Sequence, residues 1–424
     1  MARPSGPGPT GAPVAAKNSL EDLAILGGQP AFPEPLHVGR PNVMNRERLL
    51  ERLNDLLDRR WLTNNGPYVQ ELERALAARL GVKHCVATCN ATLALELVLR
   101  AADLNGEVIV PSFTFVATAH ALQWLGITPV FCDVDLATHN IDPDLVEALI
   151  TPRTTAILGV HLWGRPCDVK ALADIARRHR LTLLFDAAHA LGCSLSGRMV
   201  GGFGEAEVFS LHATKFVNAF EGGAVTTNDD RLAARVRAMR NFGFAGEDTV
   251  VSVGTNAKMS EASAAMGLTS LECMDDVIAI NRRNYAHYRR LLGNLVGIRL
   301  LPYDERERSN FQHVVVEVDP VAAGLDRDTL RDVLRAENVL ARRYFHPGVH
   351  RMEPYRSSLA RPHLPRTELL TDRVLSLPTG TAAGPWEIEA VYSILRVALA
   401  GASEVKGRAS RAAPPANDGG GSPP

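Results

Sequence analysis

Short apolar runs alternate with amphipathic stretches through the middle of the chain. The apolar runs have the length of strands and predict them over His84–Thr88, Glu107–Val110, Pro129–Cys132, Thr155–Val160, Leu181–Phe185, Val208–Leu211 and Gly223–Thr226. The stretches between them have helical periodicity and predict helices over Ala91–Ala101, Val116–Leu125, Pro143–Ile150 and Val169–Arg180. This alternation is typical of an α/β fold in which helices cover both faces of a mostly parallel sheet.

The pattern changes at about residue 281. Beyond it we expect, in chain order, a long helix, a strand, a helix, a strand and a last helix, over Asn281–Leu295, Phe311–Val318, Arg327–Glu337, Val339–Tyr344 and Pro385–Leu399. The sequence therefore predicts a large domain over residues 32–280 and a smaller C-terminal α+β domain over 281–402. Residues 1–31 read as a flexible leader, and 403–424, rich in Pro and Gly, as a disordered tail.

Composition narrows the possible partners. The 46 basic residues nearly balance the 47 acidic ones, so no overall field attracts nucleic acid or an anionic membrane. The six cysteines form no CxxC pair and several lie in apolar runs, which indicates reduced core residues and no metal site. The N-terminus lacks the apolar segment of a signal peptide, and no stretch is long enough to span a membrane. These features favour a cytoplasmic protein without nucleic-acid or membrane partners.

Lys215 closes the run 208–215, an apolar strand that leads into a small polar turn. Desolvation at the edge of a core disfavours the charged form of a lysine and lowers its pKa, which leaves a nucleophilic amine. Such an amine can form a Schiff base with an aldehyde cofactor. The alternative is a lysine whose stem packs at a strand end while its ammonium stays in water.

Asp186 follows the apolar run 181–185, at the carboxyl end of a predicted buried strand. Open α/β sheets place their ligand sites at such ends. Pyridoxal phosphate needs a lysine for its aldehyde and a carboxylate for its pyridine nitrogen. Asp186 alone could be a cap or turn residue, but the ordered pair with Lys215 favours the cofactor.

A turn over 89–95 follows the first predicted strand and opens a helix at Asn90. The free N–H groups of a helix N-terminus hold phosphate well, and the hydroxyls of Thr92 and Ser210 could add to them. The alternative for Asn90 is an ordinary N-cap. Phe115 could stack on a cofactor ring or pack in the core, and His189 could touch the phenolic oxygen of the cofactor or be structural.

Two further segments carry candidate chemistry. The glycines of the run 221–223 permit close backbone approach or unusual dihedral angles. The turn 342–347, Arg-Arg-Tyr-Phe-His-Pro, is basic and flanked by aromatic residues. It could meet an anionic substrate or be a solvated loop.

Together these motifs resemble the nucleotide-sugar aminotransferases of the DegT/StrS group, within the type I (aspartate-aminotransferase) fold of pyridoxal-phosphate enzymes. The resemblance extends over roughly Phe32 to Ala400 and rests on the motifs Asn64–Pro67, Asn90–Thr92, Pro111–Thr118, Phe185–Ala190, Ser210–Lys215, Gly254–Glu261 and Tyr344–Pro347.

The resemblance implies roles for individual residues. Lys215 would hold the cofactor aldehyde and Asp186 the pyridine nitrogen. Further cofactor contacts would come from Ala91, Thr92, Phe115, Ser210 and His189, the last where the family often has Gln. Asn256 matches a residue that reaches the phosphate from the neighbouring subunit, so the resemblance implies a homodimer with shared sites.

The chain also departs from the family pattern. Asn90-Ala91-Thr92 replaces the commoner Ser-Gly-Thr, and Asn256-Ala257-Lys258 replaces Asn-aromatic-Arg, which affects the expected phosphate and substrate contacts. Family members that act as dehydratases carry His in place of the lysine. Because Lys215 is intact, we expect amino transfer, with L-glutamate as donor and a keto-sugar nucleotide as acceptor.

The position of the ketone is the finest expectation. His212 together with Glu221-Gly222-Gly223 resembles the enzymes that aminate carbon 4, which implies dTDP-4-keto-6-deoxy-D-glucose as substrate in aminodeoxysugar biosynthesis. Amination at carbon 3, or of a cyclitol ketone, is the nearer alternative. A non-catalytic pyridoxal-phosphate-binding regulator is the farther one, and it is opposed by the lack of a DNA-binding module and by the presence of both Lys215 and Asp186.

Overall fold

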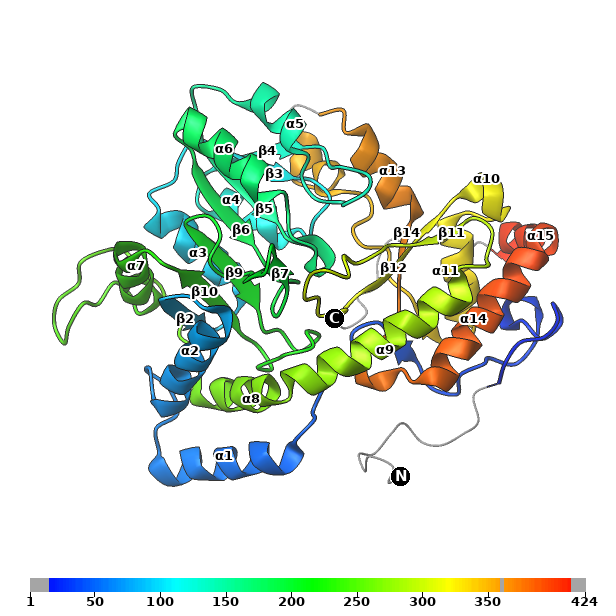
Figure 1. The fold of residues 1–424 in the computed structure, drawn as a ribbon, viewed down its shortest axis with the longest axis horizontal. Helices are drawn as coiled ribbons and strands as arrows, with labels where there is room; N and C mark the ends of the chain where they lie inside the picture. The colour runs from blue at the N-terminus through cyan, green and yellow to red at the C-terminus, as the bar shows by residue number, and fades with distance from the viewer. Residues whose placement is uncertain (1–14, 359–361, 413–424) are drawn as a thin grey trace.

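A seven-stranded sheet forms the centre of the larger unit in the computed structural model, which describes residues 15–358 and 362–412 (Figure 1). The strand order is β2 (His84–Thr88), β10 (Gly223–Thr227), β9 (Ala206–Ser210), β6 (Thr182–Asp186), β5 (Thr154–Val160), β3 (Glu107–Pro111) and β4 (Thr128–Cys132). Only β10 runs antiparallel to its neighbours in this sheet. All seven predicted strands are present, and the predicted mostly parallel α/β fold is confirmed.

Helices cover both faces of this sheet, as the alternation of apolar runs and amphipathic stretches predicted. Side chains along each strand alternate between two cores, so that Phe209 of β9 packs on one face and Val208 on the other. The first core contains α2 (Pro67–Leu80), α6 (Val169–His179) and α8 (Glu261–Glu272). The second contains α3 (Ala91–Ala101), α4 (Ala117–Trp124) and α7 (Asp230–Arg240).

Smaller elements join these layers. The helix predicted over 143–150 is a short α-helix followed by a 3₁₀ turn. These and the remaining elements of the larger unit are α1 (Arg46–Arg59), α5 (Pro143–Val146), η2 (Glu147–Leu149), η3 (Leu162–Gly164), β7 (Ser194–Leu195) and β8 (Arg198–Met199).

The smaller unit is built on an antiparallel sheet with the order β11 (Ile298–Leu300), β12 (Val314–Val318) and β14 (Val374–Leu377). Its helices are α9 (Met274–Leu292), α10 (Pro320–Ala323), α11 (Arg327–Ala336), α13 (Pro365–Arg373), α14 (Pro385–Ala400) and the turn η5 (Gly380–Ala382). The turn η4 (Val349–Arg351) and helix α12 (Tyr355–Ser358) lie later in the chain than the start of this unit but pack Val349 and Tyr355 in the second core of the larger one. Val277 of α9 packs in the core of the larger unit, whereas Tyr288 packs in that of the smaller one. The expected boundary near residue 280 therefore falls inside a continuous helix, which crosses between the units in Figure 1.

Two expected strands of this unit are shorter than predicted. The strand expected from Phe311 begins at Val314, because Phe311 has a φ of 49°, in the left-handed region that a strand excludes. The strand expected over 339–344 is only β13 (Val339–Leu340), and Arg342 makes an isolated bridge to Ser376.

The expected flexible leader is corrected for residues 15–31, which pack on the smaller unit. This segment contains η1 (Ala24–Leu26) and leads into β1 (Leu36–His37), which pairs with β13. The buried carboxylate of Glu337 accepts hydrogen bonds from the amides of Ala24 and Ala31, each at 2.7 Å, and lies 3.1 Å from the ammonium of Lys17. The backbone amides of this segment are thus satisfied by Glu337, a distant side chain that the composition of the segment could not reveal. Residues 1–14 lie outside the described part.

The expected disordered tail is corrected for residues 403–412. They belong to α15 (Ala402–Ala412), whose Val405 is buried in the core of the smaller unit beside the N-terminal segment. Packing of one apolar face therefore orders a stretch of low overall hydrophobicity. Residues 413–424 lie outside the described part.

Two observations concern partners and redox state. Within residues 15–358 and 362–412, no helix combines the length and the apolar character needed to cross a membrane. All six cysteines are free thiols, and four of them are buried.

Candidate active site

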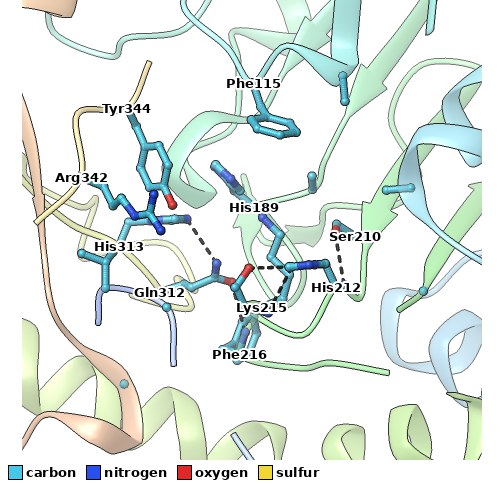
Figure 2. A pocket seen from close by; sticks show the side chains of 18 of the residues that line it. Phe115, His189, Ser210, His212, Lys215, Phe216, Gln312, His313, Arg342 and Tyr344 are labelled. Atoms are coloured by element: carbon cyan, nitrogen blue, oxygen red, sulfur yellow. Dashed lines mark hydrogen bonds between the residues drawn. The ribbon is translucent and has the colours of Figure 1, made fainter. Parts of the chain in front are cut away.

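A cavity of about 390 Å³ lies where the two units meet (Figure 2). Its strand-end wall comes from the larger unit and consists of Asn90, Ala91, Thr92, Asp186, His189, Ser210 and Lys215. Its small-unit wall consists of Gln312, His313, Arg342 and Tyr344. The cavity thus brings together seven of the eight predicted site residues, with Phe115 at its edge, and only Asn256 lies outside it.

Lys215 sits in the turn after β9, where its backbone amide donates to the carbonyl of His212 at 2.8 Å. Burial lowers the pKa of its ammonium to about 8, against an opposite effect from the charge of Asp186. The side chain has no hydrogen-bond partner among the described residues. A lysine with this pKa has a much larger neutral, nucleophilic fraction near neutral pH than an ordinary lysine, which is the activation that the sequence predicted.

Asp186 ends β6, next to β9 in the sheet. Its Oδ2 accepts from the hydroxyl of Thr118 at 2.8 Å, and its Oδ1 accepts from the amide of Ala188 at 3.1 Å. Burial raises the pKa of this carboxyl, whereas these two hydrogen bonds and Lys215 lower it. A cationic group beside Asp186 would offset the cost of burying its charge.

His189 is a neutral hydrogen-bond donor. Its Nδ1 accepts from the backbone amide of Trp163 at 3.3 Å, which places the ring proton on Nε2. Burial and the nearby charge of Lys215 hold the pKa of His189 well below its ordinary range. The imidazole therefore presents an uncharged N–H near Lys215.

The N-terminus of α3 combines a cap with a free anion site. The side chain of Asn90 accepts from the amide of Leu93 at 2.8 Å, and the carbonyl of Asn90 accepts from Ala94 at 3.2 Å. Of the four N–H groups that a helix start leaves open, those of Ala91 and Thr92 remain for a ligand. The N-cap interpretation of Asn90 is therefore confirmed, and the amides of Ala91 and Thr92 beside it stay open.

The glycines after the lysine turn serve close packing. A Cβ on Gly223 would lie 2.6 Å from the carbonyl carbon of Asn90, and one on Gly222 would lie 2.9 Å from the methyl group of Met259. Neither glycine has a positive φ. Their role is to let β10 approach the turn at the start of α3.

Of the two phenylalanines before α4, one packs in the core and the other lies at the cavity. Phe113 is 1 % exposed and belongs to the core, whereas Phe115 is 59 % exposed and lies above His189 at the cavity (Figure 2). Asn256 is exposed and forms an isolated bridge to Asn241.

Sequence reasoning missed Asn42 and the pair Gln312 and His313. The amide of Asn42 donates to the carbonyl of Phe216 at 3.0 Å, and its Oδ1 accepts from the hydroxyl of Thr381 at 2.5 Å. Asn42 thereby ties the lysine turn to the smaller unit. The sequence did not mark Asn42, because a polar residue in a segment without periodicity looks like any loop residue. Its burial is visible only in the structure.

Comparison with known proteins agrees with this geometry. The model of the DegT/DnrJ/EryC1/StrS aminotransferase family matches residues 44–396. The dTDP-4-amino-4,6-dideoxy-D-glucose transaminase of Shigella dysenteriae is 36 % identical over 365 residues, which cover 86 % of this chain and 99 % of the relative. A solved structure of DesI in the presence of its TDP-sugar product is 54 % identical, with a TM-score of 0.89 over 92 % of this chain and 100 % of that one.

A second solved structure, S. venezuelae DesV in complex with a ketimine intermediate, is 32 % identical, with a TM-score of 0.77 over 83 % of this chain and 94 % of that one. The family match spans both units and the cavity lining except residues 38–42. The chain belongs to the DegT/DnrJ/EryC1/StrS aminotransferase family.

Proposed function

We propose that this aminotransferase uses pyridoxal phosphate to move an amino group from L-glutamate to carbon 4 of dTDP-4-keto-6-deoxy-D-glucose. The observation that carries the proposal is the shared cavity of Lys215 and Asp186, at the ends of adjacent strands. An activated amine, a buried carboxylate and open helix amides together form a set that pyridoxal phosphate needs.

The described residues fit this cofactor on three counts. The open amides of Ala91 and Thr92, with the hydroxyl of Ser210, suit its phosphate. The carboxylate of Asp186 gains a counter-charge from a protonated pyridine nitrogen, which relieves the cost of burial. The Nε2–H of His189 suits its phenolic oxygen, and Phe115 offers a flat face for its ring.

The bound cofactor supplies an aldehyde for amine exchange and a ring that accepts electrons from a substrate carbon. The amine of Lys215 would hold the aldehyde of the cofactor, and the same amine would move the proton at the substrate carbon. Asp186 stays ionised and fixes the ring nitrogen, with its own position held by Thr118 and Ala188. Glutamate leaves as its keto acid, and the sugar ketone receives the nitrogen.

Carbon 4 is supported by resemblance and by the cavity. The relative from Shigella dysenteriae is named for a 4-amino sugar, and it matches this chain over nearly its whole length. His212 and Glu221, the pair that resembled carbon-4 enzymes, both line the cavity, with Nε2 of His212 3.5 Å from Oε1 of Glu221.

A panel of keto-sugar nucleotides tests the proposal. Purified enzyme with pyridoxal phosphate and L-glutamate is mixed with 4-keto and 3-keto 6-deoxyhexoses carrying dTDP or GDP, and with a cyclitol ketone. We expect NMR of the product from the dTDP-4-keto sugar to show nitrogen on carbon 4. Exclusive conversion of a 3-keto isomer or a cyclitol would overturn the substrate assignment. Failure of glutamate to change the cofactor absorption, with a competent holoenzyme, would favour the regulator instead.

The proposal includes a homodimer with shared sites. Asn256 points outside the cavity of its own chain, and the loop before it exposes apolar side chains. Those exposed are Phe242, Phe244, Val250, Val251 and Val253. Apolar side chains gathered at one surface favour an interface, and a second copy of this chain would bring Asn256 to a neighbouring phosphate.

Subunit mixing tests the shared sites. Lys215→Ala and Asn256→Ala subunits, each inactive or weak alone, form hybrids in which one site carries both changes and the other carries neither. Free exchange at equal amounts should restore about a quarter of wild-type activity, since half the dimers are hybrids with one intact site each. Hybrids that form, as shown by differently tagged subunits, yet stay inactive would remove Asn256 from the partner site.

We also place the enzyme in the cytoplasm. The free thiols of all six cysteines suit a reducing compartment. Fractionation of cells that express the tagged protein checks this placement.

A further inference from the structure

The small-unit wall carries three polar groups that have no partner among the described residues. Arg342 has no ion pair, although its neighbour Arg343 lies 3.1 Å from Oδ1 of Asp328. The hydroxyl of Tyr344 has no hydrogen bond within the described part of the chain. His313 is 7 % exposed, and its Nδ1 is buried and unsatisfied. A buried unpaired ring nitrogen is costly, and the half-buried guanidinium of Arg342 is free to pair, so their presence together at a cavity calls for a ligand.

All three groups are hydrogen-bond donors. The Oε1 of Gln312 accepts from the amide of Phe216 at 3.4 Å, so the NH₂ of Gln312 faces Nε2 of His313 at 3.3 Å. Nε2 of His313 is therefore the acceptor of that bond, and the ring proton sits on Nδ1. Burial lowers the pKa of His313 to about 3, so the ring is neutral. Donors without acceptors predict an anionic ligand.

The wall is fixed before any ligand arrives. The amide of Arg342 donates to the carbonyl of Ser376 at 3.1 Å, and the amide of Ser376 donates back to Arg342 at 2.9 Å. The ring of Tyr344 packs against those of Phe345 and Trp163, with centroids 5.2 and 6.2 Å away. The backbone of Arg342 and the ring of Tyr344 therefore lose little entropy when a ligand binds.

The position of the wall selects the anion. Figure 2 shows Arg342 and Tyr344 beside His313 on one side of Lys215, with Ser210 and His212 on the other. The His313 ring lies 4.4 Å from that of His189, and both rings feel the charge of Lys215. A group that binds beside His313 is therefore near His189 and within the electrostatic reach of Lys215.

Chemistry then separates the two anions that enter this site. The α-carboxylate of an amino acid is bonded to the carbon from which Lys215 takes the proton. The diphosphate of a 4-keto-sugar nucleotide lies across the pyranose ring from the reacting carbon. A guanidinium also presents paired N–H groups that match the two oxygens of a carboxylate. We infer that Arg342, Tyr344 and His313 form the subsite for the α-carboxylate of the amino donor, an inference that rests on the proposed transamination.

The two half-reactions separate this subsite from the sugar site. Arg342→Gln is compared with Arg343→Gln, a matched change one residue away at an arginine that pairs with Asp328 and does not line the cavity. Single-turnover absorption of the holoenzyme gives the apparent Kd for L-glutamate in one half-reaction and for the keto-sugar nucleotide in the other. Calorimetry with glutarate, which cannot react, adds a binding readout.

We expect Arg342→Gln to raise the apparent Kd for glutamate about 10- to 100-fold, the loss typical of a charged hydrogen-bonded pair. Glutarate binding should weaken in parallel, while the keto-sugar half-reaction and the Arg343→Gln enzyme stay near wild type. Arg342→Lys keeps the charge without the paired N–H groups and should fall between. Circular dichroism checks that each variant is folded. If Arg342→Gln does not fold, Arg342→Lys takes its place in the test.

Three results would overturn the inference. A weakened keto-sugar half-reaction with unchanged glutamate binding would assign Arg342 to the diphosphate. Unchanged binding of both substrates would leave Arg342 without a ligand role. An equal loss of glutamate affinity in the Arg343→Gln enzyme would show that the effect comes from the overall positive charge of this region and not from a contact made by Arg342. Failure of the transamination itself is distinct, because it would appear in the wild-type enzyme with every keto sugar.

Discussion

The two walls of the cavity differ in how their polar groups are satisfied. In the strand-end wall, Asp186 accepts two hydrogen bonds, Asn90 caps α3 and His189 accepts from a backbone amide. In the small-unit wall, Arg342 has no ion pair, and Tyr344 and Nδ1 of His313 have no hydrogen bond among the described residues. The strand-end wall thus holds its carboxylate and its imidazole in place around the open amine of Lys215 and the open amides of Ala91 and Thr92, whereas the small-unit wall presents donors without acceptors.

This difference suits two kinds of ligand. A cofactor that stays through every turnover is served by groups already held in place, because preorganised dipoles need no rearrangement when charge develops. A substrate that arrives and leaves in every turnover is served by donors that bind its anion and then return to water. In the proposed function, the strand-end wall performs the chemistry, and in the further inference the small-unit wall recognises the amino donor.

The variant with the largest expected effect removes the amine of Lys215 from the strand-end wall. We expect Lys215→Ala to lose turnover with both substrates, because holding the cofactor and moving the proton both need this amine. Since the Lys215 side chain has no hydrogen-bond partner among the described residues, thermal unfolding should occur at or above the wild-type temperature. Lys83→Ala, on an exposed lysine, is the control. Turnover near the wild-type rate would remove Lys215 from the site.

The next test removes a charge and keeps the shape. Asp186→Asn should slow the glutamate half-reaction about 10²- to 10³-fold, as loss of a preorganised electrostatic group commonly does. Thr118→Val, which removes one hydrogen bond to the same carboxylate, should cost less. Stopped-flow absorption measures both. An Asp186→Asn rate equal to that of wild type would contradict the role of the charge.

The smallest effect concerns pH. Only the neutral form of Lys215 reacts with an aldehyde, so the rate of pyridoxal-phosphate uptake by the apoenzyme should rise with pH and level off above about 8, the lowered pKa of Lys215. With an ordinary lysine, whose pKa is 10.5, the rate of uptake would keep rising up to that pH. Because Asp186 raises this pKa, Asp186→Asn should move the midpoint to lower pH. A midpoint near 10 would show that burial does not activate the amine.

The strand-end wall was predictable because its information is local. β6 and β9 each show an apolar run that ends in a polar residue, and parallel neighbours place both ends at one edge of a sheet. The start of α3 was readable from Asn90 for the same reason. What the pattern did not decide was whether Phe115 packs in the core or faces the cavity, which depends on the direction of a single loop.

The small-unit wall was only partly predictable. Arg342 and Tyr344 stood out as a basic, aromatic turn, but Gln312 and His313 lay within an apolar run that predicted a strand. The positive φ of Phe311 delays that strand to Val314 and leaves the pair at the cavity. The N-terminal segment was misjudged for a related reason. Its order comes from the buried pair of Lys17 and Glu337, residues that are far apart in sequence.

One measurement tests the central claim, that Lys215 in the strand-end wall holds the cofactor. The holoenzyme is reduced with sodium borohydride and digested, and its peptides are mapped by mass spectrometry. The account predicts a phosphopyridoxyl group on Lys215 alone, and none after prior incubation with an excess of L-glutamate, which releases the lysine. A label on Lys17, Lys83 or Lys258 in place of Lys215, or a label on Lys215 that glutamate does not prevent, would contradict it.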